Sequence, residues 1–256
     1  MKTVVFIGAS IMTHISHALM NALWALNIST EILAVSGATY YSTQIREKLV
    51  AFKNTHPEGV LYFFVLLQSN FNWCYQRTIE KVGRPPVRVI HMHKKHRPEL
   101  ESCVLAFKDL CEFIQMTFTN NRIQIIHLPP LPRLYQNQCC ERGFRFENMF
   151  QEIVHSEKLL AAFASKHDYV QVVRHAALLL AYFTRNEEQR EQFVDKAYLT
   201  SWKRFKNALK QIKNQENMYF RNPNGNLFAK DETHLSDQGA AFVTSLYVAA
   251  VLQYAR

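Results

Sequence analysis

Glycine is scarce in this sequence, with seven glycines among 256 residues. There is also no low-complexity run, no internal repeat and no apolar stretch long enough to span a membrane. These absences exclude a fibrous, a repetitive or a disordered chain. Hydrophobic residues make up 48% of the composition, which is enough for one sizeable core, or for one core with an appended helical lobe.

Cysteine spacing and the character of the N-terminus bear on the cellular compartment. The five cysteines are odd in number and lack the spacing of a metal finger, so we expect free thiols in a reducing compartment. The apolar run at residues 4–7 is brief, and His14 and His17 interrupt the next stretch of the chain. A signal peptidase would also remove Ser10, a candidate functional residue. We therefore expect no signal peptide and an intracellular protein, either cytoplasmic or nuclear.

Positive charge exceeds negative charge, and the formal net charge is +9. Such an excess favours polyanions such as nucleic acid or an anionic membrane surface. Lys203, Lys206, Lys210 and Lys213 recur at helical spacing beside an apolar stripe. This row is either a solvated helix face or a surface that contacts nucleic-acid phosphates or lipid headgroups.

Histidines are clustered at one place in the chain, at His91, His93 and His96. Three cations, at residues 94, 95 and 97, share this segment and would oppose a divalent metal. We therefore expect a solvated basic loop or a phosphate-contacting patch here, and no metal site.

Hydrophobic periodicity alternates between two periods along the first half of the chain. Buried strands are predicted at 3–9, 31–35, 60–67, 87–92 and 123–128, and helices at 11–26, 44–53 and 99–118. This alternation predicts an α/β fold of three layers, with a central, mainly parallel sheet covered on both faces by helices.

The second half of the chain has a different pattern. From about 145 to 214 the pattern is wholly helical, and a last helix begins near residue 236 or 237. We therefore expect a single domain over residues 1–256, with a helical insertion at about 145–214.

Three candidate site residues each follow a different predicted strand: Ser10, Gly37 and Asn70. Because sites in parallel sheets lie beyond the carboxyl ends of the strands, we expect these residues to gather at one edge. The backbone N–H groups of Ser10 and Gly37 and the amide of Asn70 are suitable donors for an oxyanion. Each residue also has a simpler explanation, because Ser10 could cap a helix and Gly37 and Asn70 could be turn residues.

A D-x-x-H element near the C-terminus carries Asp231 and His234. Serine is a weak nucleophile that needs a base, and histidine oriented by a carboxylate supplies one. The set Ser10, His234 and Asp231 therefore suits acyl transfer. The alternative is that His234 and Asp231 only form a turn.

The blocks Gly8-Ala9-Ser10, Gly37, Ser69-Asn70 and Asp231 to His234 together resemble the GDSL-like, or SGNH, hydrolases. The likeness covers residues 1–135 and 225–256, and the segment between them is not explained by it. Three positions depart from the family pattern. Ala9 and Phe71 stand where that family carries aspartate, and Gln68 stands where it carries glycine.

The resemblance implies a serine esterase without a cofactor or a metal. Its substrates would be acyl esters of carbohydrates, lipids or other small molecules. The resemblance also leaves a second function open, since some proteins of this kind bind RNA. On that alternative the domain is catalytically weak and binds nucleic acid through its lysine row, as in viral or mobile-element-associated proteins.

Overall fold

The computed structural model describes residues 2–67, 98–128, 157–173, 235 and 237–255. A sheet of five parallel strands lies at its centre, in the order β2-β1-β3-β4-β5. The strands are β1 (Lys2–Gly8), β2 (Thr30–Ala34), β3 (Gly59–Leu66), β4 (Asn121–His127) and β5 (Val170–Val172).

Both faces of the sheet are buried, which is why its central strands have continuous apolar runs. In β1 the side chains of residues 4–7 are at most 2% exposed. Successive side chains of a strand point to opposite faces. Val4 and Phe6 accordingly belong to one hydrophobic cluster, and Val5 and Ile7 belong to another.

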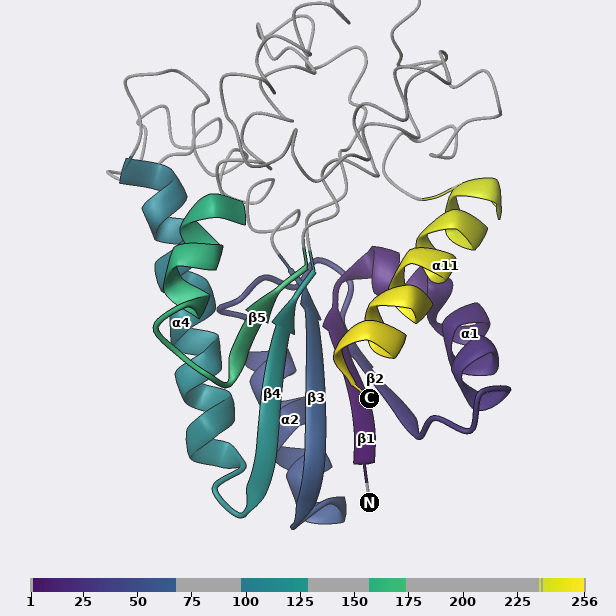
Figure 1. Ribbon diagram of the computed structural model, residues 1–256, viewed down its shortest axis with the longest axis horizontal. Helices are drawn as coiled ribbons and strands as arrows, with labels where there is room; N and C mark the ends of the chain where they lie inside the picture. The colour runs from purple at the N-terminus through teal and green to yellow at the C-terminus, as the bar shows by residue number, and fades with distance from the viewer. Residues whose placement is uncertain (1, 68–97, 129–156, 174–234, 236, 256) are drawn as a thin grey trace, which may run out of the picture.

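Helices cover each face and complete three layers (Figure 1). Helices α1 (Ser10–Trp24) and α11 (Asp237–Tyr254) pack on the face of Val4 and Phe6. The opposite face is covered by α2 (Thr43–Thr55), by α4 (Pro98–Thr117) and by the helical residues 157–164. The predicted three-layer α/β fold with a parallel sheet is therefore confirmed.

The segment expected to be wholly helical contains a strand. Residues 157–164 are helical, but Val170–Val172 form β5 and pair with β4. The prediction was wrong here because a three-residue strand is too short to show a period of its own, and its valines also fit a helical face. Residues 145–156 and 174–214 lie outside the described residues, as does the strand predicted at 87–92.

The strand order places a topological switch point between β1 and β3. From β1 the chain moves outward to β2 and then returns to β3 on the other side of β1. Connections at this point leave the sheet in opposite directions, and open α/β sheets bind their ligands there. None of the helices within the described ranges combines the length and apolar character that a membrane crossing requires.

Candidate active site

Ser10 lies directly beyond the carboxyl end of β1, at the switch point. Ala9 is the N-cap of α1 in an extended conformation, and Ser10 is the first helical residue and half-buried. The alternative explanation, in which Ser10 caps the helix, is therefore wrong, because the cap position belongs to Ala9 and no side chain caps it. The serine is left available for another role.

Gly8 makes the tight passage from β1 into α1 possible. A Cβ atom at this position would overlap the Cβ of Met12 and would lie 3.0 Å from its Cγ. Glycine is therefore needed here because the helix passes so close to the strand end. The Gly8 carbonyl also accepts a hydrogen bond from the Val35 N–H at 3.1 Å, which ties the end of β1 to the segment after β2.

The first turn of α1 is suited to negative charge. The Thr13 N–H donates to the Ala9 carbonyl at 3.1 Å, so the intrahelical bonds of α1 begin there. The amide groups that precede Thr13, including that of Ser10, have no acceptor within the helix. These N–H groups lie at the positive end of the helix dipole, which stabilises an anion.

Gly37 lies in a turn directly after β2. Its φ is +77°, and the Ala38 N–H donates to the Val35 carbonyl at 3.0 Å. A positive φ at the third position of such a turn favours glycine strongly. Gly8 of β1 pairs with Ala34 of β2, so Ser10 and Gly37 follow the paired ends of adjacent strands. The structure thus brings these two predicted residues to the same edge of the sheet.

The other predicted site residues, Asn70, Asp231 and His234, lie outside the described residues. The residue that follows His234 in the sequence is described. Leu235 is 1% exposed and belongs to the same buried cluster as Ile11 and Met12. A covalent neighbour of His234 and a covalent neighbour of Ser10 therefore pack in one core.

The lysine row at Lys203, Lys206, Lys210 and Lys213 also lies outside the described residues.

An open hollow lies at the outer edge of the sheet, beside β2. It is lined by Ala34, Val35, Gln44, Glu47, Lys48 and Ala51. Because its lining includes neither Ser10 nor Gly37, we assign it no part in the candidate site.

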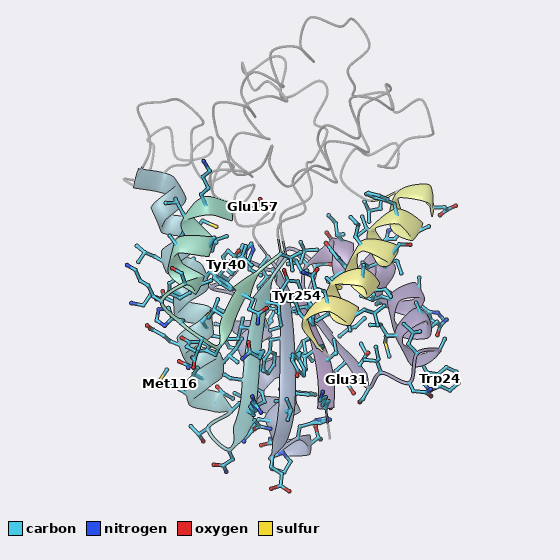
Figure 2. The ribbon with its side chains drawn as sticks, in the orientation of Figure 1. Trp24, Glu31, Tyr40, Met116, Glu157 and Tyr254 are labelled. Carbon is cyan, nitrogen blue, oxygen red and sulfur yellow. The ribbon has the colours of Figure 1, made fainter. Side chains whose placement is uncertain are left out.

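A buried polar pair near this edge was not foreseen from the sequence. The Tyr40 hydroxyl lies 2.8 Å from Nε2 of His127, and both side chains are fully buried. Tyr40 comes from the segment between the Gly37 turn and α2, and Figure 2 shows it near the carboxyl ends of the strands. The one signal in the sequence is His127 itself, a titratable residue that directly follows two isoleucines at the end of a strand.

Burial controls the protonation of this pair. Desolvation lowers the pKa of His127 to about 3, and it raises the pKa of Tyr40 well above its usual value. Both groups are therefore neutral at physiological pH, and their hydrogen bond joins two uncharged partners.

Comparison with known proteins gives matches at the level of structure. No protein-family model and no curated protein sequence matches the chain. A GDSL-like lipase from Bacteroides thetaiotaomicron superposes with a TM-score of 0.51 at 12% identity, covering 98% of this chain and 88% of that one. An acetyl xylan esterase superposes with a TM-score of 0.51 at 15% identity, covering 98% of this chain and 100% of the other.

These two likenesses extend over nearly the whole chain and agree with the architecture of the sheet. Its strands are parallel, and helices cover both of its faces. At such low identity the likeness concerns the fold alone. The chain therefore has the fold of the GDSL-like, or SGNH, hydrolases.

Proposed function

We propose that this protein is an SGNH-type serine esterase that cleaves an acyl ester through an acyl-enzyme. Ser10 Oγ attacks the ester carbonyl while His234 accepts its proton, and Asp231 orients the imidazole. The tetrahedral intermediate then collapses, and the imidazolium returns the proton to the leaving alcohol. Water, deprotonated by the same histidine, hydrolyses the acyl-enzyme and restores the Ser10 hydroxyl.

The observation that carries this proposal is the shared burial of Ile11 and Leu235. Ile11 is bonded to Ser10 and Leu235 is bonded to His234, and both belong to one hydrophobic cluster. Consecutive Cα atoms are only about 3.8 Å apart. Ser10 and His234 are therefore each bonded to a residue of the same core, which supports a hydroxyl and an imidazole that meet beyond the end of β1.

The oxyanion would be stabilised by donors from separate parts of the fold. Ser10 contributes its N–H at the positive end of α1, and Gly37 contributes its N–H from the turn after β2. The amide of Asn70 completes the set in this proposal. Removing one such donor typically slows an acyl-transfer enzyme by about 10²- to 10³-fold, so the alignment of these donors contributes strongly to the proposed rate.

The substrate class is inferred from the chemistry of the proposed site and from the structural neighbours. One neighbour is named a lipase and the other an acetyl xylan esterase. We propose a small acyl ester, with a carbohydrate or lipid alcohol as the leaving group. The proposed reaction uses side chains and water alone and requires no cofactor.

The decisive experiment labels the full-length protein with a fluorophosphonate, which reacts with activated serines. We expect labelling of the wild type, and its loss in Ser10→Ala and His234→Ala. Hydrolysis of p-nitrophenyl acetate should fall by about 10⁴-fold or more in Ser10→Ala, since the nucleophile itself is removed.

Ser16→Ala is the matched control for this experiment. Ser16 lies on the same helix, and its hydroxyl donates to the Thr13 carbonyl at 2.8 Å. This variant should keep wild-type labelling. Labelling that persists in Ser10→Ala would overturn the assignment of the nucleophile.

A further inference from the structure

Gly37 itself makes few contacts with the described part of the fold. Gly37 is exposed, and no atom of the described residues lies within 4 Å of the place its Cβ would take. The residues that follow it are buried, since Ala38 is 2% exposed and Tyr40 is fully buried. The direction of the Gly37 N–H therefore depends on how the segment 35–42, here called the glycine loop, is held by these neighbours.

Tyr40 ties the glycine loop to a distant strand. Its hydroxyl bonds to His127, which is 87 positions away in the sequence. In the sheet, β4 stands three places from β2, and at normal strand spacing this is on the order of 14 Å. The glycine loop and the Tyr40 side chain therefore reach from β2 across one buried face of the sheet, and the hydrogen bond forms at the end of β4.

The His127 side of this hydrogen bond belongs to a rigid part of the fold. His127 is the last residue of β4, and its carbonyl accepts a hydrogen bond from the Val173 N–H at 3.0 Å. The Phe107 ring of α4 meets the His127 ring edge-on, with 4.8 Å between the centroids. Phe107 also packs against Tyr40 at 5.9 Å, so both rings are held in place.

The tautomer of His127 determines which of the two side chains donates the hydrogen bond. Nδ1 is buried and has no hydrogen-bond partner in the described part of the chain. A buried N–H without an acceptor is rarer in proteins than an acceptor without a donor. The proton therefore belongs on Nε2, which donates to the Tyr40 oxygen.

We propose that Tyr40 and His127 are positioning residues, whose hydrogen bond holds the glycine loop so that the Gly37 N–H stays aimed at the oxyanion. This inference rests on the proposed esterase function. The bond acts through Gly37 and does not touch the substrate. Its loss should therefore weaken binding of the transition state more than binding of the ester.

The variants that test this proposal are Tyr40→Phe, His127→Leu and His127→Gln. Tyr40→Phe and His127→Leu remove one partner of the bond. His127→Gln places an amide N–H near the former position of Nε2 and should restore the hydrogen bond to Tyr40. Tyr247→Phe is the matched control, because Tyr247 is also buried, but on the other face, and its hydroxyl has no partner among the described residues.

Two measurements are made on each full-length variant. With p-nitrophenyl acetate, we expect kcat to fall about tenfold in Tyr40→Phe and His127→Leu, while KM changes by less than about twofold. Hydrogen exchange of peptides covering 35–42 should quicken about tenfold in the same two variants, and peptides of α1 should not change. His127→Gln and Tyr247→Phe should stay close to the wild type in both measurements.

The outcomes separate this inference from the proposed function. Unchanged kcat in Tyr40→Phe overturns the positioning role, whatever the exchange shows. Equal losses of kcat in His127→Gln and His127→Leu also overturn it, because the restored donor should matter. A wild type that neither hydrolyses the ester nor labels at Ser10 overturns the esterase function, and the catalytic role of the pair with it. The exchange data then still decide whether the bond holds the loop.

Discussion

At the residue scale, His127 couples the stability of the protein to pH. Its folded-state pKa of about 3 lies below the value near 6.5 expected for an unfolded chain. Between these values the unfolded chain binds a proton that the folded protein does not. The contribution of the neutral, buried imidazole is therefore complete above about pH 6.5, and it is lost as the pH falls toward 3. Tyr40 is neutral throughout this range, because burial raises its pKa.

The predicted consequence is a loss of stability on mild acidification. From pH 7 to pH 5, titration of this one histidine should lower the free energy of unfolding by about 2 kcal/mol. Urea unfolding at the two pH values measures the loss. His127→Gln lacks the titrating group, so its own loss should be smaller by that amount. The same loss in both proteins would contradict the assignment of this pH dependence to His127.

At the scale of the elements, the passage from β1 into α1 determines where Ser10 is held. Gly8 and Gly37 both serve the candidate site, but for different reasons. Gly8 is required by the close approach of Met12, whereas Gly37 is favoured by its positive φ in open space. Substitution by alanine therefore has a steric cost at Gly8 and a conformational cost at Gly37.

We predict that Gly8→Ala is the more damaging of the two variants. The new methyl group would push α1 away from the sheet, and overpacking of this kind costs about 1–3 kcal/mol. Gly37→Ala should cost about 1 kcal/mol, because only the left-handed backbone is strained. The urea midpoints of the two variants give the comparison. Fluorophosphonate labelling of Gly8→Ala should also slow, since Ser10 moves with the helix.

That order would be contradicted if Gly8→Ala were as stable as the wild type. Such a result would mean that α1 can shift at no cost, and that Ser10 is not held by the turn that precedes it.

At the scale of the whole molecule, the last described helix completes the core begun by the first strand. Helix α11 packs on α1 and on the face of the sheet that carries Phe6. Its buried side chains include Val243, Tyr247 and Val251, each at most 2% exposed, and the Tyr247 ring stacks on Phe6 at 6.3 Å. The two ends of the described chain therefore share one hydrophobic cluster.

Deleting residues 237–256 should abolish cooperative unfolding, although no candidate catalytic residue is removed. Each large buried side chain contributes about 1.5–3 kcal/mol, and together they approach the total stability of about 5–15 kcal/mol typical of a domain. Circular dichroism during urea unfolding measures the effect. The control is Ser245→Ala with Gln253→Ala, because both residues are on the exposed side of α11. A truncated chain with a sharp transition would show that the sheet is stable without this helix.

Local pattern was enough to predict most elements of the fold. The strand runs of β1 and β3 are apolar because both faces of a parallel sheet are covered, and this leaves a signal in a few consecutive residues. The same reasoning placed Ser10 and Gly37 directly after their strands. It missed β5, whose three residues are too few to show a repeated alternation, and it offered a capping role for Ser10 that belongs to Ala9.

The sequence by itself determined the layers of this protein, the position of Ser10 after the first strand and the position of Gly37 in the turn after the second. Only the tertiary structure decided the strand order, the pairing of Tyr40 with His127 and the shared burial of Ile11 with Leu235. The physical reason is the range of the interactions. Periodicity and turn chemistry act between residues a few positions apart, whereas these contacts join residues that are remote in the chain and meet only when the sheet is assembled.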